Sequence, residues 1–352
     1  MRLFTVGPVE MFDRTLEVRS KQIPYFRTDA FSSVMLENAE RLKRILNTKE
    51  DSKCAILTAS GSGAMEAAVS NSFDKKDKLL VINGGSFGHR FIQLCEIYQL
   101  PFDEIKLDYN ETLTQEHLDS YMDNEYTALL VNIHETSTGQ LYDLKMLSQF
   151  CKQKKMKFVV DAISSFLSDP LSMDEAGIDC VILSSQKALS LAPGLGIVMM
   201  NQKFYNENVK DKPMKNLYLS LNEHIINMER GQTPNTPAVG ICYELLDMLR
   251  YIEEKGVANI TKEIQARALR FRAMIQPLGL RVPDFPLSNT LTPIVFDNDK
   301  AHEVYTYLKD KYDIYVTPSG GALKDKIIRV GHIGNMKDEY YDDLIEKMKE
   351  VL

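Results

Sequence analysis

The sequence contains no tryptophan and only five cysteines among its 352 residues. The cysteines stand singly, without a Cys-x-x-Cys pair or a Cys/His cluster at zinc-binding spacing, so we expect no metal site. They are Cys54, Cys95, Cys151, Cys180 and Cys242. This scatter predicts reduced thiols, which are typical of a cytoplasmic protein.

Long apolar runs and an excess of basic charge are also missing. No segment approaches the roughly 20 apolar residues of a membrane helix, and Met1–Pro8 lacks the apolar stretch of a signal peptide. The 42 Lys and Arg residues face 49 Asp and Glu residues, a formal net charge of −7. Nucleic acids and anionic membranes attract proteins with basic patches. We therefore expect neither partner, and small-molecule chemistry is favoured.

From about residue 54 to residue 200, short apolar runs alternate with stretches of helical periodicity. This alternation predicts a mostly parallel sheet covered by helices on both faces. The expected strands are Cys54–Ser60, Leu79–Asn83, Ala128–His134, Lys157–Asp161, Cys180–Ser185 and Gly196–Asn201, and the expected helices are Ala64–Phe73, Phe91–Leu100, Leu144–Lys154 and Met173–Ala176.

The run Thr233–Pro237 interrupts the chain before a long expected helix, Ala238–Glu254, which Gly256 ends. Strand and helix patterns then mix less regularly. The expected elements there are helices at Asn259–Met274, Ala301–Lys311 and the C-terminus, and strands at Thr292–Phe296, Ile314–Thr317 and Ile327–Val330. Because one core rarely supports a chain of this length, we expect an N-terminal arm (1–15), a large domain (16–255) and a small α/β domain (256–352).

Ligands of open parallel sheets bind beyond the carboxyl ends of the strands, so the residues that follow each strand are candidates for a binding site. Ser60-Gly61-Ser62-Gly63 leads directly into a helix, where free backbone N–H groups and the helix dipole favour an anion. It lacks the Lys-Ser/Thr of a P-loop and the full Gly-x-Gly-x-x-Gly of a dinucleotide site. A plain strand-to-helix turn is the alternative.

Two further loops carry an aromatic ring and hydroxyl groups. Phe87 lies in the glycine-rich loop 84–90, where it serves either as a stacking platform or as a core residue. Thr136 lies in Glu135-Thr136-Ser137-Thr138-Gly139, whose hydroxyl groups either bind a phenolic oxygen or cap a helix.

A carboxylate and an amine follow the next two strands. Asp161 ends an almost wholly apolar strand, where it either caps structure or holds a protonated nitrogen. Lys187 follows Gln186 at the end of another buried strand. Lysines are usually solvated, but at this position Lys187 is a candidate for a desolvated amine that forms a Schiff base. The five signals together are the contacts that pyridoxal phosphate requires.

With these motifs in place, the chain resembles the class V (fold type I) pyridoxal-phosphate aminotransferases. The similar branch contains the alanine–glyoxylate, serine–pyruvate and 2-aminoethylphosphonate–pyruvate aminotransferases. The resemblance runs from Thr5-Val6-Gly7-Pro8-Val9 to Arg329-Val330-Gly331, and its most specific motifs are Ser60–Gly63, Phe87–Arg90, His134–Gly139, Asp161–Ser165 and Ser184–Leu189. It implies an α/β fold with a mostly parallel seven-stranded sheet in a large domain and a smaller C-terminal α/β domain.

The resemblance also implies roles for individual residues. Lys187 would bind the cofactor as a Schiff base and move the substrate's proton, while Asp161 would pair with the pyridine nitrogen. Phe87 would stack on the ring where relatives often carry tryptophan. The other implied cofactor contacts are Ser62, Gly63, Ala64 and Gln186 at the phosphate and Thr136 at the phenolic oxygen.

A segment of the neighbouring subunit also holds the phosphate in this family, which implies a homodimer. Here the segment reads Thr233-Pro234-Asn235-Thr236, with Thr233 where some relatives have tyrosine. Arg329 would bind the substrate carboxylate, a task that suits a guanidinium. Gly7 would also contact the substrate. Arg27 and Arg90 are further cations, either near substrate or in structural ion pairs.

The leading hypothesis is a ping-pong transaminase that moves an amino group from alanine, serine or 2-aminoethylphosphonate to pyruvate or glyoxylate. A desulfurase-like lyase of the same fold is the alternative, although no cysteine follows Cys242 and desulfurases tend to stack a histidine where Phe87 lies. A member that binds the cofactor without turnover is less compatible with Lys187, Asp161 and Arg329. A nicotinamide dehydrogenase would leave Lys187 unexplained.

Overall fold

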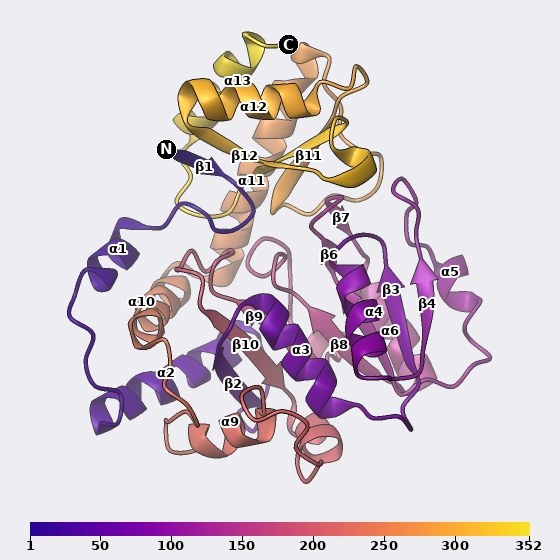
Figure 1. Cartoon of the computed structure of the whole chain (residues 1–352), viewed down its shortest axis with the longest axis vertical. Helices are drawn as coiled ribbons and strands as arrows, with labels where there is room; N and C mark the ends of the chain where they lie inside the picture. Colours follow the sequence, from indigo (N-terminus) through magenta and orange to yellow (C-terminus); the bar gives the residue numbers. More distant parts are fainter.

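The computed structural model describes all 352 residues and contains a central seven-stranded sheet (Figure 1). The strand order is β2-β10-β9-β8-β5-β3-β4. The strands are β2 (Lys53–Thr58), β3 (Leu79–Asn83), β4 (Phe102–Lys106), β5 (Ala128–Asn132), β8 (Lys157–Asp161), β9 (Cys180–Ser184) and β10 (Leu195–Met200). Only β10 runs antiparallel to its neighbours, β2 and β9. The predicted mostly parallel sheet is confirmed.

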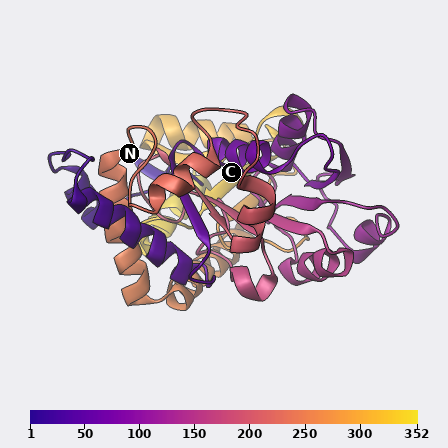
Figure 2. The same cartoon turned by 90° about the horizontal axis from the view of Figure 1, so that it is seen from below.

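Helices cover both faces of this sheet, which explains its apolar strands: β3, β5, β9 and β10 bury every residue (Figure 2). Each face has its own core, of 44 and 27 buried residues. The larger core includes residues of α2 (Asp29–Ile45), α5 (Gln115–Asp119), α6 (Leu144–Lys154), α7 (Met173–Ala176) and α10 (Val239–Lys255). The smaller includes residues of α3 (Gly61–Ser72), α4 (Gly88–Ile97), α8 (Gln202–Phe204), the π-helical turn Tyr205–Val209 and α9 (Leu221–Met228).

A second, four-stranded sheet has the order β1-β12-β13-β11. Its strands are β1 (Arg2–Phe4), β11 (Leu291–Val295), β12 (Ile314–Pro318) and β13 (Ile327–Gly331), and its core includes residues of α11 (Val257–Ile275), α12 (Ala301–Tyr312) and α13 (Asp338–Lys349). Strand β1 pairs with β12 in parallel, so the start of the chain joins the C-terminal sheet, and both termini lie there (Figure 1). The domain division at residues 15 and 255 stays a prediction.

The remaining elements are short. They are α1 (Asp13–Arg19), the hairpin β6 (His134–Glu135) and β7 (Gln140–Leu141), and the 3-10 turns Gln276–Leu278 and Gly321–Leu323. The expected strand Ala128–His134 is thus divided between β5 and β6, while β1, β4, α1, α2, α5 and α9 were not predicted. None of the helices combines the length and the apolar character needed to cross a membrane.

Candidate active site

A cavity of about 180 Å³ lies at the carboxyl ends of β2, β3, β5, β8 and β9. Twelve residues line it: Ser60, Gly61, Ser62, Met65, Phe87, Arg90, Thr136, Asp161, Ile163, Ser164, Gln186 and Lys187. Six of them were predicted as site residues, namely Ser62, Phe87, Thr136, Asp161, Gln186 and Lys187. The topology therefore brings these six side chains, which are spread over 126 positions of sequence, to one place.

Lys187 lies just beyond β9, and its side chain is only 9% exposed. Burial lowers its pKa to about 8, although the Asp161 carboxylate opposes this shift. An amine with a lowered pKa is more often neutral and therefore more nucleophilic. Gly7 packs against its stem, because a Cβ at Gly7 would lie 2.6 Å from Lys187 Cδ. Gly7 also has φ +137°, which disfavours any other residue there.

Asp161 ends β8 and is 6% exposed. Desolvation raises its pKa to about 7, while the N–H of Ile163, which donates to Oδ1 at 2.8 Å, acts in the opposite direction. The nearby Glu135 raises the pKa further, and Lys187 and Arg90 lower it. A carboxylate this poorly solvated is stabilised by a cation or a protonated nitrogen beside it.

The start of α3 forms an anion-binding end of the cavity. Ser60 caps the helix, and Ala64 donates its N–H to the Ser60 carbonyl, so the N–H groups of the first turn before Ala64 face outward from the helix start. Gly61 lies close to the Ile163 side chain, which would have to shift for any Cβ there, since that Cβ would lie 2.6 Å from Ile163 Cδ1. Ala64 itself is fully buried.

Arg90 and Arg27, which the sequence could not place, have different surroundings. Arg90 lines the cavity, donates from Nη1 to Ser62 Oγ, and lies 5.4 Å from the centroid of the Phe87 ring. Arg90 has no acidic partner within 4.0 Å, unlike many arginines of this chain. Arg27 instead donates to Gln232 Oε1 and the Thr233 carbonyl, outside the cavity.

Glu135 is a buried carboxylate that the sequence analysis did not include among the site residues. It accepts hydrogen bonds from the N–H groups of Phe87 at 3.4 Å, Gly88 at 2.9 Å and Ser137 at 3.0 Å. Ser137 Oγ and Asn132 Nδ2 also donate to it, at 2.5 and 2.8 Å. Because α4 has no side-chain cap of its own, Glu135 fixes both the helix start and the Phe87 loop.

Behind Thr136 lies a buried chain of polar side chains that was also missed. Thr136 Oγ1 donates to Ser164 Oγ at 2.7 Å, and Ser164 Oγ is 2.9 Å from His134 Nδ1. Burial and the cations Lys187 and Arg329 lower the pKa of His134 to about 3, so its ring is neutral. The spacing of His134 and Thr136 was visible in the sequence, but their link through Ser164 is a tertiary contact.

Arg329 projects from the middle of β13 and is 8% exposed. Its Nη1 donates to the Thr136 carbonyl at 2.8 Å and its Nη2 to the Pro318 carbonyl at 2.7 Å, which places it beside the cavity. Its Nε is buried without a partner. Desolvation lowers the pKa of Arg329 to about 10, so the guanidinium remains charged at neutral pH.

Four predicted cofactor contacts are absent from the cavity lining: Gly63 and Ala64 in the first turn of α3, and Thr233 and Thr236 farther along the chain. Thr233 is buried, and its hydroxyl donates to the Asn235 carbonyl at 2.7 Å. Thr236 is exposed and lines a surface groove together with residues 18–24 of the same chain. The single chain therefore does not bring Thr233 or Thr236 to Lys187.

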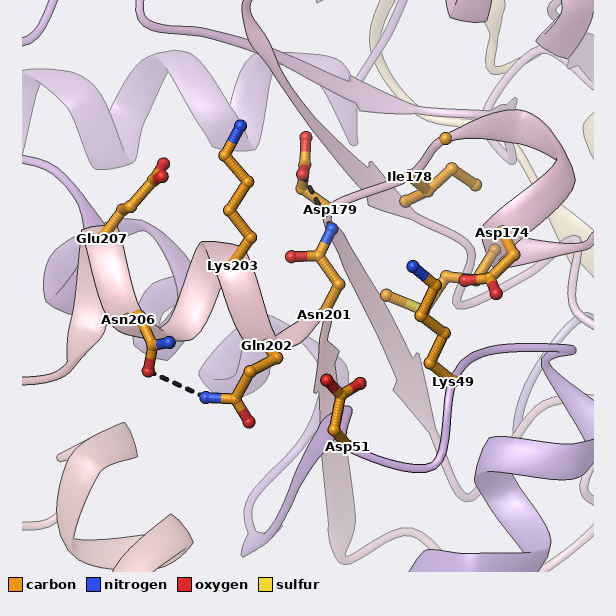
Figure 3. Close-up of a pocket in the computed structure, with 12 residues that line it drawn as sticks. Lys49, Asp51, Asp174, Ile178, Asp179, Asn201, Gln202, Lys203, Asn206 and Glu207 are labelled. Atoms are coloured by element: carbon orange, nitrogen blue, oxygen red, sulfur yellow. Dashed lines mark hydrogen bonds between the residues drawn. The ribbon is translucent and has the colours of Figure 1, made fainter.

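A polar groove of about 660 Å³ lies at the opposite end of the strands, at the start of β9 and the end of β10 (Figure 3). Lys49 and Lys203 line it together with Asp51, Asp174 and Glu207, so its charges are of both signs. Its Asn201 is bonded to Asp179 and its Gln202 to Asn206. None of the predicted site residues lies in this groove.

The cavity fits pyridoxal phosphate on three structural observations. Asp161 is a buried carboxylate without an ion-pair partner, so it is available to a protonated pyridine nitrogen. Arg90 is an unpaired cation at the start of α3, where a phosphate would lie. Gln186 Oε1 is buried without a hydrogen-bond partner. Buried polar groups are normally satisfied, so these three point to a missing ligand.

Comparison with known proteins agrees with this geometry. A 2-aminoethylphosphonate–pyruvate transaminase of Bacteroides fragilis is 29% identical, covering 86% of this chain and 85% of the relative. An L-aspartate–glyoxylate aminotransferase of Paracoccus denitrificans is 24% identical, covering 96% and 87%. The crystal structure of an alanine–glyoxylate aminotransferase from Nostoc sp. has a TM-score of 0.92 and 25% identity, covering 99% and 94%.

The model of the class-V aminotransferase family matches residues 25–325, most of the chain. Its fold is accordingly fold type I, as the resemblance implied. The chain belongs to the class-V aminotransferases, enzymes that depend on pyridoxal phosphate.

Proposed function

We propose that this aminotransferase moves an amino group from a small donor, such as alanine, serine or 2-aminoethylphosphonate, to pyruvate or glyoxylate. The observation that carries the proposal is the meeting of Lys187 and Asp161 in one dry cavity, with Arg329 beside it. The relatives named above act on these kinds of substrate, which supports the class but does not select the donor.

The proposed roles follow from the surroundings of each residue. When bound, the cofactor supplies an electron sink for the carbon that carries the amino group. Lys187 would hold it through Nζ, and its amine, when free, would move the proton of the substrate α-carbon. Asp161 keeps a proton on the ring nitrogen, and its raised pKa is lowered again by that positive charge.

The remaining residues bind and orient. Ser62, Gly63, Gln186 and Arg90 form the phosphate end in this proposal, supported by the unpaired charge of Arg90. Ala64 lies behind them, with its N–H bonded within the helix. Phe87 supplies a face for the ring, and Thr136 a hydroxyl for the phenolic oxygen.

Substrate orientation is assigned to Arg329 and Gly7. The free Nε of Arg329 and its neighbouring Nη2 present a fork of N–H groups that matches a carboxylate or a phosphonate. Gly7 lies against the stem of Lys187, next to where the substrate amine must arrive.

A desulfurase-like lyase is less compatible with this chain. That reaction needs a mobile nucleophilic cysteine, and all five cysteines here are buried. Burial raises the pKa of Cys54, Cys95 and Cys242 to about 12, which disfavours the reactive thiolate.

The proposed reaction is tested by the visible absorbance of the cofactor-loaded protein. We expect one of L-alanine, L-serine and 2-aminoethylphosphonate to bleach the lysine-dependent band, and pyruvate or glyoxylate to restore it. A band that none of these donors bleaches would contradict the proposed substrates.

We also infer a cytoplasmic homodimer whose sites are completed by the neighbouring subunit. Ile23 and Tyr25 are 58% and 67% exposed, and residues 18–24 border a groove of about 810 Å³ that also contains Thr236. Exposed apolar side chains around a groove are typical of a protein interface. A second copy seated there would carry Thr233 and Thr236 toward the facing cavity. The free cysteines support the location.

Shared sites predict complementation between two inactive subunits. Lys187→Ala removes the amine, and Thr236→Asp adds a negative charge at the proposed phosphate contact. Co-expression of the two variants should restore about a quarter of wild-type activity, because half of randomly formed dimers carry one intact site of two. The activity of purified mixtures and their mass by sedimentation measure this. If the variants form dimers but no activity returns, each site must lie within one chain.

A further inference from the structure

A second cavity, of about 440 Å³, adjoins the cofactor cavity between the two sheets. The same two loops line both: Gly85, Ser86 and His89 face the second cavity where Phe87 and Arg90 face the first. Ser137 and Thr138 likewise follow Thr136. Arg329 lines the second cavity and donates to the Thr136 carbonyl in the wall of the first. Arg329, the arginine proposed to bind the substrate, therefore also lines this second cavity.

The lining of the second cavity contains no acidic residue, although the chain has 49. Its ionisable groups are Arg329, Lys106, His89 and Tyr109. Lys106 makes no ion pair within 4.0 Å, in contrast to Lys157 and Lys212. The polar groove at the opposite end of the strands instead contains both positive and negative side chains (Figure 3). This wall is suited to an anion.

None of the acids close in sequence to this wall lines it, and Asp108, between Leu107 and Tyr109, is exposed. Glu104 accepts a hydrogen bond from Asn83 Nδ2 at 2.6 Å. Glu135 accepts five hydrogen bonds, including those from Gly88 and Ser137, and is fully buried. None of these carboxylates forms an ion pair with Lys106 within 4.0 Å.

Unsatisfied donors in the same wall indicate a missing ligand. Tyr109 Oη, Ser319 Oγ and Arg329 Nε are buried without hydrogen-bond partners. Burial raises the pKa of Tyr109 to about 12, so its hydroxyl remains a donor. Native structures rarely leave such groups unpaired, and Ser86, Ser137 and Thr138 add further hydroxyl groups to the lining.

The size of the second cavity exceeds what a monoacid donor needs. Its 440 Å³ correspond to more than ten times the ~30 Å³ that one water molecule occupies in the liquid. The methyl group of alanine would leave this acid-free, cationic space filled only by water.

We propose that this cavity binds a second acidic group of the substrate. The preferred donor or 2-oxo acid would then carry two acidic groups, one held by Arg329 and the other by Lys106 and the hydroxyl groups of Tyr109 and Ser319. Carboxylate and phosphonate share the required chemistry. The proposal rests on the aminotransferase function and changes its preferred substrates from the monoacids named above to diacids.

Non-reactive acids test the cavity without turnover. Calorimetry of the cofactor-loaded protein compares succinate and 3-phosphonopropionate with butyrate, which has one acidic group. We expect the diacids to bind at least about tenfold more tightly, since charge-assisted hydrogen bonds exceed neutral ones. Lys106→Gln should remove most of this difference and Tyr109→Phe part of it. Lys76→Gln, at an exposed lysine that does not line the cavity, should leave it intact.

The two diacids separate the sources of the second group, because tighter binding of 3-phosphonopropionate would select phosphonates and tighter binding of succinate would select carboxylates. Equal binding of butyrate and both diacids, or a diacid preference that survives Lys106→Gln, would overturn the proposal. As donors, L-aspartate should exceed its neutral isostere L-asparagine in kcat/KM. Failure of every donor alongside a Lys106-dependent diacid preference would instead contradict the proposed function alone.

Discussion

Lys187→Ala is expected to remove the visible cofactor band and to lower transamination by at least about 10³-fold, within the range of a lost general acid–base group. The substitution removes both the amine that holds the cofactor and the group that moves the substrate proton. The cavity contains no second lysine that might replace it. Absorbance after reconstitution and a coupled transamination assay measure the two losses.

The fold should survive this change, which separates chemistry from misfolding. Burial lowers the pKa of Lys187 to about 8 from 10.5, so at neutral pH the folded protein holds a charged amine that is poorly solvated. The stability that the neutral amine contributes is present above pH 10.5 and is lost as the pH falls through 8. Cofactor-free Lys187→Ala should therefore melt at or above the wild-type temperature at pH 7.

Lys203→Ala is the matched control, because Lys203 lies in the polar groove at the opposite end of the strands. It should keep the band and the activity. A Lys187→Ala protein that kept a wild-type band would show that the amine lies on another residue.

Asp161→Asn is expected to lower transamination by at least about 10²-fold while it stabilises the cofactor-free protein. Asparagine cannot carry the negative charge that holds a proton on the ring nitrogen. Without the cofactor, however, the Asp161 carboxylate is a buried charge with no acid–base partner and a pKa of about 7. One substitution should thus change activity and stability in opposite directions.

The pH dependence of this stability follows from the raised pKa. The Asp161 carboxyl has a pKa of about 7 when folded and 3.8 as its reference value, so its favourable contribution is present below pH 4. It is lost as the pH rises through 7. At pH 8 the free energy of unfolding of cofactor-free Asp161→Asn should exceed that of wild type by up to about 4 kcal/mol.

Denaturant unfolding of both proteins at pH 4 and pH 8 measures this difference, which should be small at pH 4. Asp179→Asn is the control. Asp179 accepts hydrogen bonds from Asn201 Nδ2 and the Phe158 N–H at the opposite end of the strands, so loss of its carboxylate should destabilise the fold at pH 8. An Asp161→Asn protein less stable than wild type at pH 8 would contradict the buried, unpaired carboxylate.

Fully buried strands were the elements that the sequence located best. β3 and β8 match the predicted ranges because both faces are covered and the sequence is continuously apolar. β4 was missed because it forms the sheet edge, and Phe102–Lys106 contains three charged residues among five. α2 was also missed, although Phe31, Val34 and Met35 begin a clear helical repeat of buried residues.

The site shows the same division between local and tertiary signals. Lys187 and Asp161 could be predicted because Asp161 ends an apolar strand and Lys187 lies three residues beyond another. Glu135 could not, because its importance comes from hydrogen bonds to a loop some 50 positions earlier in the chain. The contacts proposed for Thr233 and Thr236 would need a second subunit, and a single chain places both residues outside the cavity.

The first residues of the chain give the site a mechanical property. β1 pairs with β12, which pairs with β13, the strand that carries Arg329. Gly7 follows β1 by three positions and touches the stem of Lys187. The small sheet is therefore a common frame for Arg329 and for the residue that packs on the Lys187 stem, which ties the position of the guanidinium to that of the amine.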